Sequence, residues 1–292
     1  MNNLSVIILA TSLFIIMWGM GLSLVLNDFK RILTYPRAVI IGLSNQLLIL
    51  PLIGFTLASL FSVSSEIAIG IMILAACPGG PTSNLIAHLA NGDTALSVSL
   101  TAVSSLISII TIPFIINFAL STFVQEGQMI QLNIPATIIQ IFVIVIIPVS
   151  IGMFINHKFP HFSNKMEKPV RIASALVLGL VIIGIIIKER HKMGGYFEEA
   201  GLIALSLNII SMAVGFISAR LLKVSKKQSI SISIESGIQN GTMAIMIATT
   251  LLSNTAFAVA PAIYSIIMFF TGGAVIYFGT KSSSKRTKLV NS

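Results

Sequence analysis

A single carboxylate lies well inside an apolar stretch of this sequence. It belongs to Glu235, which opens the polar run Glu235-Ser236-Gly237-Ile238-Gln239-Asn240-Gly241-Thr242. The other acidic residues lie near the ends of apolar stretches or between them, and no Lys or Arg lies in the interior of one. An ionised carboxylate in an apolar interior costs at least a few kcal/mol unless it is paired. Either a proton or a bound cation must therefore neutralise Glu235, unless it is a permanently protonated structural acid.

A second polar interruption precedes it in the chain. The run Cys77-Pro78-Gly79-Gly80-Pro81-Thr82-Ser83-Asn84 places two prolines around two glycines. Proline lacks the amide donor and clashes with the preceding turn, and glycine tolerates an unwound backbone, so a helix must break here. Freed backbone groups at membrane depth are tolerated only where they are buried in protein or line a cavity, where they can bind ions. A single Pro kink would be structurally neutral, but four such residues together indicate a site.

Neutral oxygens accompany the carboxylate. Ser97, Thr101, Ser104 and Ser108 recur at helical spacing and form one polar stripe on an apolar helix. Gln46 is another polar residue in an apolar stretch. Each alone is as easily a helix-to-helix hydrogen-bonding residue. Together with Glu235 they supply the oxygen ligands that a hard cation such as sodium prefers.

The composition indicates a protein embedded in lipid. Only 9% of the 292 residues are charged and 55% are hydrophobic, whereas soluble proteins carry about a quarter charged residues. Nine apolar stretches are long enough to cross roughly 30 Å of hydrocarbon as helices. The sequence thus predicts an all-α polytopic membrane protein with a single domain, 1–280, and a short basic tail, 281–292. The nine predicted spans lie near 4–26, 36–62, 67–90, 94–121, 134–156, 169–187, 198–219, 229–252 and 255–279.

The basic residues predict the orientation. Fifteen of the 18 flank the first span or follow the fifth, seventh and ninth, and only Lys188, Arg190 and Lys192 lie on the opposite side. Because basic loops stay in the cytoplasm, the N-terminus is expected outside and the C-terminus inside a plasma or inner membrane. The net charge of +9 is not gathered on one polar surface, so nucleic acid is not an expected partner.

The chemistry of an enzyme is not evident. The lone Cys77 excludes an internal disulfide, and no CxxC or HExxH spacing offers a metal site. Two broken spans in corresponding positions of two halves instead predict an inverted-repeat transporter with its site where the breaks cross. The half-helix ends favour an anionic substrate group.

Three segments resemble the bile acid:sodium symporter family over nearly the whole chain. The first is Trp18-Gly19-Met20-Gly21-Leu22 with Asp28-Phe29 after it. The second is Cys77-Pro78-Gly79-Gly80 with Ser83-Asn84 and Gly92-Asp93-Thr94-Ala95-Leu96-Ser97, and the third is Glu235-x-Gly237-x-Gln239-Asn240. Their order and spacing carry the resemblance.

The resemblance implies a core domain around two crossed helices, a panel domain, alternating access, and two co-transported sodium ions. The residue-wise match gives the first ion Ser83, Asn84, Ser97, Thr101 and Glu235, and the second Gln46, Glu235, Gln239 and the carbonyls of Ser236 and Ile238. Asn240, Thr82 and Pro81 are expected near the substrate, although Pro81-Thr82 departs from the pattern of relatives. The expected function is sodium-driven uptake of an organic anion, either bile-acid-like or a small carboxylate such as pantoate. A proton-coupled carrier of the same fold is the alternative, and no obligatory protein partner is expected.

The charge bias yields a prediction about topology. In a Cys77→Ala background, Lys165→Cys and Lys227→Cys should react with impermeant thiol reagents only from the cytoplasm, and Gln125→Cys and Asn254→Cys only from outside. Labelling of the Lys227→Cys variant from outside would contradict the nine-span arrangement.

Overall fold

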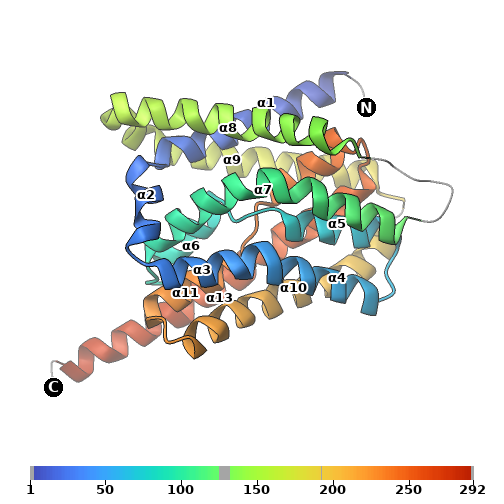
Figure 1. Ribbon diagram of the computed structural model, residues 1–292. Coiled ribbons are helices and arrows are strands. Elements are labelled where there is room, and N and C mark those ends of the chain that lie inside the picture. Colours follow the sequence, from blue (N-terminus) through green and yellow to red (C-terminus); the bar gives the residue numbers. More distant parts are fainter. Residues whose placement is uncertain (1–2, 125–131, 192, 291–292) are drawn as a thin grey trace.

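Every regular element of the computed structural model is a helix among the residues that it describes, which are 3–124, 132–191 and 193–290 (Figure 1). The first half of the chain contains α1 (Asn3–Ser23), α2 (Leu26–Lys30), η1 (Arg31–Leu33), α3 (Pro36–Ser44), η2 (Asn45–Ile49), α4 (Leu50–Leu60), α5 (Ser65–Ala76), α6 (Pro81–Leu89) and α7 (Thr94–Phe123). The second half contains α8 (Ile134–Lys158), α9 (Pro160–Lys188), α10 (Met193–Leu221), α11 (Lys226–Gly237), α12 (Gly241–Met246), η3 (Ile247–Leu251), η4 (Ala256–Ala258) and α13 (Val259–Val290). The expected all-α fold is therefore confirmed.

Among the described residues, six helical segments are long and apolar enough to cross a membrane, and two bent pairs raise the number to eight if each pair is one span. The bent pairs are α1 with α2 and η1, at 73°, and α5 with α6, at 67°. The predicted span 229–252 corresponds to α11, α12 and η3. It falls outside this group because α11 is polar, with Lys226, Lys227, four serines and Glu235. A count of nine spans stays a prediction that depends on this segment.

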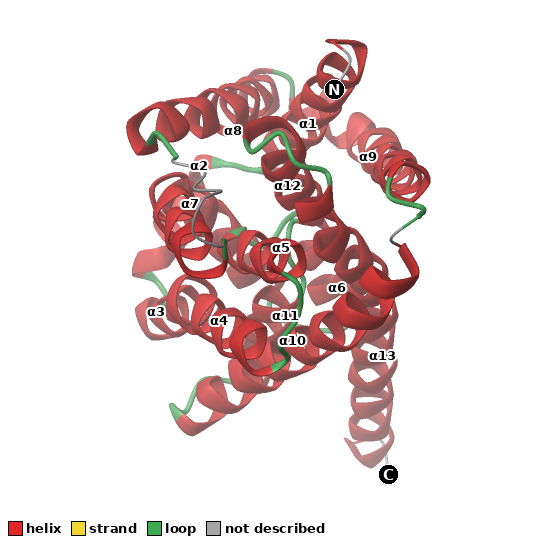
Figure 2. Cartoon of the chain, turned by 90° about the vertical axis from the view of Figure 1, so that its right-hand side faces the viewer, coloured by secondary structure: helices red, strands yellow, loops and turns green. Residues whose placement is uncertain are grey.

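The helices are arranged in a row of three above a larger group. Figure 2 shows α8, α1 and α9 side by side, and α1 packs against both of its neighbours. The larger group contains α3 to α7, α10, α11 and α13, with α5 packed against α4 and α7 and α10 against α11 and α13. Two layers are thus distinguishable in the part of the chain that the structure describes.

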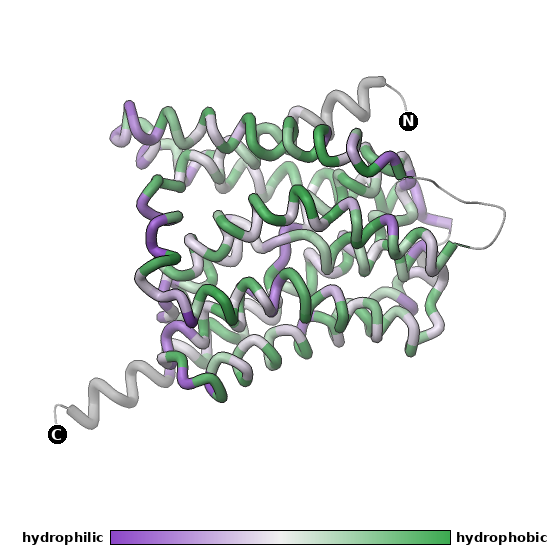
Figure 3. The backbone as a smooth tube through the Cα atoms, in the orientation of Figure 1, coloured by the Kyte–Doolittle hydropathy of each residue, from purple (hydrophilic) through white to green (hydrophobic). Residues whose placement is uncertain are grey.

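The hydropathy of the residues changes along the long axis of the bundle. Hydrophilic residues gather at its two ends, and hydrophobic residues cover the helices between them (Figure 3). α1 begins at one end and α13 finishes at the other (Figure 1). The predicted basic tail begins as a continuation of α13, which extends to Val290. Gln125, expected on the outer side, lies outside the described residues.

The turn after α1 is fixed by a buried acid. Asp28 is only 4% exposed, and its Oδ2 accepts a hydrogen bond from the Val25 amide at 2.8 Å. Its Oδ1 lies 3.5 Å from the Arg31 guanidinium. Asp28 therefore fixes the start of α2, which packs against α7 of the larger group.

Glycines bring α1 and α8 into backbone contact. A methyl group added at Gly21 would overlap the backbone of Val149, and one added at Gly152 would overlap the carbonyl oxygen of Trp18. Small residues are the usual means by which membrane helices approach this closely, because packing rather than the hydrophobic effect holds them together.

This contact yields a matched pair of substitutions. Gly152→Ala should destabilise the folded protein by about 1–3 kcal/mol, since the added methyl has backbone atoms in its way. Gly184→Ala in α9 meets no atom within 4 Å and should be neutral or slightly stabilising. Thermal unfolding of the detergent-solubilised variants measures both. Equal unfolding midpoints would show that α1 and α8 are not in this close contact.

Candidate ion-binding site

The two breaks predicted from the sequence meet in the middle of the bundle. The first separates α5 from α6 at Cys77–Gly80, and the second separates α11 from α12 at 238–240. The backbone amide of Asn240 donates a hydrogen bond to the carbonyl oxygen of Pro78 at 2.9 Å. A backbone amide freed at one break thus has its hydrogen-bond partner in a backbone carbonyl freed at the other.

The local sequence explains why a new helix begins after each break. Pro81 is the first residue of α6, a position that suits proline because its missing amide would have no helical partner there. The Asn240 side chain accepts a hydrogen bond from the Met243 amide at 3.0 Å and so caps α12. Both new helices therefore begin beside the crossing.

Glu235 lies at this crossing and is fully buried. Its Oε1 accepts hydrogen bonds from the hydroxyls of Ser83 at 2.7 Å and Ser97 at 2.5 Å. Its Oε2 accepts from the Thr101 hydroxyl at 2.9 Å and the Gln46 amide at 3.2 Å. None of these four donors carries a charge, so they solvate the carboxylate without neutralising it.

Asn84 completes a compact set of oxygens. Its Oδ1 lies within hydrogen-bond distance of the same two hydroxyls, 2.9 Å from Ser97 and 3.1 Å from Thr101. All five residues expected around the first ion are thus brought together, with only side-chain oxygens facing one another. Hydroxyl groups can rotate and present lone pairs in place of protons, so this set can ligate a hard cation.

The residues expected around the second ion also lie together. The Gln46 amide nitrogen donates to the Glu235 carbonyl at 2.9 Å, and the Gln239 amide nitrogen donates to the Ser236 carbonyl at 2.7 Å. The Oε1 atoms of Gln46 and Gln239 are buried and have no hydrogen-bond partner among the described residues. A buried acceptor without a donor is costly, and rotation of each amide would turn its oxygen toward the carbonyls that a cation would share.

A local widening of the helix positions Gln46. The helix is π-helical over η2, and the Leu50 amide bonds to the Asn45 carbonyl, five residues back. Pro51 follows directly and cannot donate to the preceding turn. The widened turn that accompanies this proline directs Gln46 onto Glu235, and such turns are frequent at functional sites.

Two residues of the site were not singled out by the sequence analysis. Asn208 in α10 and Tyr264 in α13 both donate to the Gly237 carbonyl, at 2.6 and 2.7 Å. They brace the end of α11 between the predicted ligands Ser236 and Ile238. The available signal was Asn208 itself, an amide in an apolar stretch like Gln46.

The remaining predicted positions divide into two groups. The Ser236 hydroxyl donates to the Ile232 carbonyl of its own helix at 2.7 Å, as do Ser104 and Ser108 to carbonyls of α7. Thr82 and Pro81 are partly buried at the start of α6, and the Asn240 side chain lies beside Gly80. The three substrate candidates therefore adjoin the crossing.

The chain matches a known protein family over more than half of its length. Residues 10–196 match the family model described as the sodium bile acid symporter family. The chain belongs to the sodium bile acid symporter family. Members of this family are sodium-coupled transporters and not enzymes, so the predicted absence of enzymatic chemistry is correct.

Several relatives of this symporter family align over most of the chain. The uncharacterized sodium-dependent transporter YocS of Bacillus subtilis is 31% identical over 276 residues, which cover 93% of this chain and 83% of the relative. The human ileal sodium/bile acid cotransporter is 30% identical over 253 residues, covering 82% and 69%. The probable sodium/metabolite cotransporter BASS1 of Arabidopsis thaliana is 28% identical over 277 residues, covering 94% and 67%. Sodium and an organic substrate are accordingly the ligands of this symporter family.

The first break offers a matched pair of substitutions. A methyl group added at Gly79 would come within 2.6 Å of Glu235 Oε2 and 3.0 Å of Ser83 Oγ, whereas one at Gly80 would come no closer than 3.5 Å to Asn240. Gly79→Ala should therefore displace the carboxylate, cost about 1–3 kcal/mol, and abolish any stabilisation by sodium. Gly80→Ala should retain both stability and the sodium response. Thermal unfolding with and without sodium tests the pair, and an unchanged sodium response in Gly79→Ala would contradict the arrangement described.

Proposed function

We propose that this protein is a symporter that couples the entry of two sodium ions to the uptake of an organic anion by alternating access. The observation that carries the proposal is the buried Glu235 carboxylate surrounded by neutral oxygen groups at the crossing of two broken helices. A cation bound there supplies the positive charge that the four donors lack.

The first ion is proposed to bind among Ser83, Asn84, Ser97, Thr101 and Glu235. Four neutral oxygens and one carboxylate give the site a net charge of −1, which one monovalent cation cancels. A second monovalent cation that shares Glu235 would bring the net charge of the centre to +1, which a bound organic anion would offset. The oxygen-only ligands and the charge of −1 therefore support a hard monovalent cation such as sodium as the first ion.

The second ion is proposed to share Glu235 with Gln46, Gln239 and the carbonyls of Ser236 and Ile238. The two unpaired amide oxygens support this assignment, since a cation would give both a partner. With two sodium ions for each monoanion, transport would carry net positive charge inward and respond to the membrane potential.

The substrate is proposed to be a carboxylate-bearing anion that binds beside the crossing. α6 and α12 both begin there, and the N-terminal end of a helix carries partial positive charge. Asn240, Thr82 and Pro81 are the proposed contacts. The relatives named above include a bile acid cotransporter and a metabolite cotransporter, so both bile-acid-like and small carboxylate anions are candidates.

The two layers are proposed to be the moving parts. The row α1, α8 and α9 would be the panel domain, and the larger group, which contains the crossing, the core domain. We propose nine spans, with an outside N-terminus and a cytoplasmic C-terminus in a plasma or inner membrane. The placement of the start of α1 and the end of α13 at opposite ends of the bundle supports an odd number of crossings.

Glu235→Gln is the decisive substitution. It preserves size but removes the charge that both ions would use, so the variant should fold while sodium-driven uptake and stabilisation by sodium collapse. At a sodium concentration ten times the dissociation constant, one site contributes about 1.4 kcal/mol to stability. Ser97→Ala and Gln46→Ala, which each remove one neutral ligand, should raise the sodium requirement and leave partial activity.

The control lies next to Glu235. Ser236→Ala removes a hydroxyl that bonds only to its own helix, so the sodium dependence should not change. Uptake of a bile acid, pantoate and pyruvate into proteoliposomes is measured with a sodium gradient, a potassium gradient and a pH gradient. Uptake that follows the pH gradient and ignores sodium would establish the proton-coupled alternative.

A further inference from the structure

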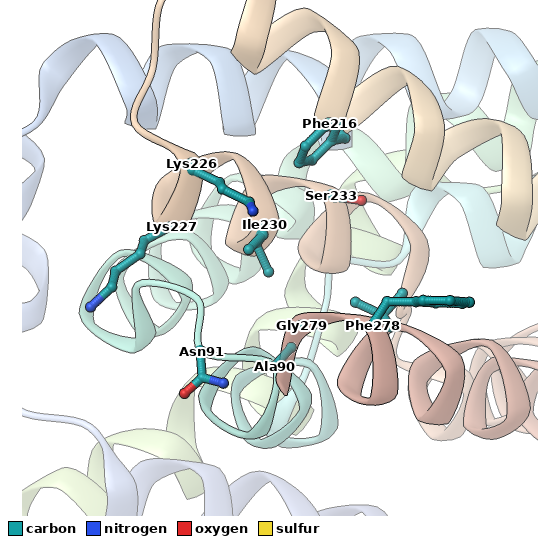
Figure 4. Close-up of a pocket in the computed structure, with 10 residues that line it drawn as sticks. Ala90, Asn91, Phe216, Lys226, Lys227, Ile230, Ser233, Phe278 and Gly279 are labelled. Carbon is teal, nitrogen blue, oxygen red and sulfur yellow. The ribbon is translucent and has the colours of Figure 1, made fainter. Parts of the chain in front are cut away.

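A cavity separate from the crossing lies between the ends of four helices. It has a volume of about 440 Å³ and is lined from α10, α11, α13 and the turn after α6 (Figure 4). In Figure 4, Phe216 of α10 lies at the top, Lys226 and Ile230 of α11 lie near the centre, and Phe278 of α13 lies to the right. Among its described lining residues, none comes from α1, α8 or α9. The described lining of the cavity thus belongs to the larger group of helices alone.

The walls of this cavity are apolar and reach the outer surface of the bundle. Phe278 is 68% exposed and Phe216 is 36% exposed. On the same two helices, Ile217, the neighbour of Phe216, and Phe270 are also exposed, at 53% and 76%. In a protein that crosses a membrane, such a surface faces lipid chains, so the cavity adjoins the bilayer from the side.

The floor of the cavity is held by close backbone packing. α13 approaches the turn after α6 so closely that a methyl group added at Gly279 would overlap the carbonyl group of Ala90. On the far side, the Ser233 hydroxyl is bonded to the Met212 carbonyl of α10 at 2.7 Å. Both contacts join helices around the cavity and preserve its shape.

The mouth of the cavity is basic. Lys226 and Lys227, the first two residues of α11, line it, and Lys226 extends over the cavity in Figure 4. Arg220 lies in the last turn of α10, and Lys223 lies in the connection between α10 and α11. The nearby acid Asp93 caps α7 through its Oδ1, which accepts from the Leu96 amide at 3.0 Å. A ligand at this mouth would meet positive charge on one side and apolar walls on the other.

We infer that this cavity binds an anionic phospholipid, with its phosphate at Lys226 and Lys227 and the upper part of an acyl chain against Phe216, Ile230 and Phe278. Basic residues at the membrane surface attract anionic headgroups, and pockets of this composition between membrane helices suit them. A soluble anion would use the lysines but not the walls. A neutral lipid would use the walls but not the lysines.

Such a lipid would contact the helix that carries Glu235. Ile230 and Ser233 face the cavity, and Glu235 faces the crossing from the same helix. The site would thus be on the opposite side of α11 from the candidate ion site. Its existence does not depend on which ion or substrate the protein carries.

The test uses the full chain in detergent with dioctanoyl phosphatidylglycerol, dioctanoyl phosphatidylcholine and inorganic phosphate as probes. The unfolding midpoint is followed as each is titrated, and native mass spectrometry counts retained lipid. Phosphatidylglycerol should raise the midpoint and be retained at lower concentration than phosphatidylcholine, and inorganic phosphate should have no comparable effect. The double variant Lys226→Gln with Lys227→Gln should weaken the affinity for phosphatidylglycerol by roughly thirtyfold. Each lysine near a headgroup contributes about a factor of five to the binding constant.

Two matched controls separate this site from diffuse attraction. Lys158→Gln with Lys165→Gln removes the same charge from the ends of α8 and α9 and should change the phosphatidylglycerol response by no more than a few-fold. Val275→Phe should fill the cavity and reduce the retention of phosphatidylglycerol, whereas Val143→Phe on the exposed face of α8 should not.

Three results would overturn the inference. Equal losses in the two pairs of lysine variants would mean that the attraction is nonspecific. Equal stabilisation by inorganic phosphate would mean a soluble anion site. Displacement of phosphatidylglycerol by a bile acid, in competition with the wild-type protein, would mean that the cavity belongs to the path of an organic anion.

Discussion

The desolvation of one carboxylate is the constraint on which the centre of this protein depends. Glu235 is fully buried, and its oxygens are held by three hydroxyls and an amide from α6, α7 and η2. Hydrogen bonds of this kind reduce the cost of burial but leave the charge in place. Each surrounding element must therefore present a polar group at one point, and this requirement explains the polar residues within otherwise apolar helices.

The same constraint extends to the backbone. A helix that stops inside the bundle leaves carbonyl and amide groups without partners, and these must be satisfied within the protein. The Pro78 carbonyl receives the Asn240 amide, and the Gly237 carbonyl receives both Asn208 and Tyr264. α11 can be polar and still lie among the other helices because Ser231 and Ser233 donate to the carbonyls of Asp93 and Met212, and its unwound end also finds partners there.

The two helix breaks and the burial of Glu235 were more predictable from sequence than the number of spans. Broken helices follow from the covalent limits of Pro and Gly, and the importance of Glu235 follows from its burial cost, so both are visible in a single chain. Ser104 and Ser108 could not be distinguished from Ser97 and Thr101 by spacing, because only the neighbouring helices decide which hydroxyls leave their own backbone. Asn208 and Tyr264 depend on contacts with α11 that are distant in sequence. The eighth stretch is ambiguous because its polarity, which suits a site, weakens the signal for a span.

The order of the ligands along the chain has a consequence for biogenesis. Gln46, Ser83, Asn84, Ser97 and Thr101 all precede Glu235. As the ribosome makes the protein from its N-terminus, the neutral groups enter the membrane first, where they cost little and can bond to their own helices. The carboxylate arrives when its donors are already present. The group that is most costly to place in the membrane thus enters after the groups that hydrogen-bond to it. A chain truncated before α11 would contain only neutral groups of the site.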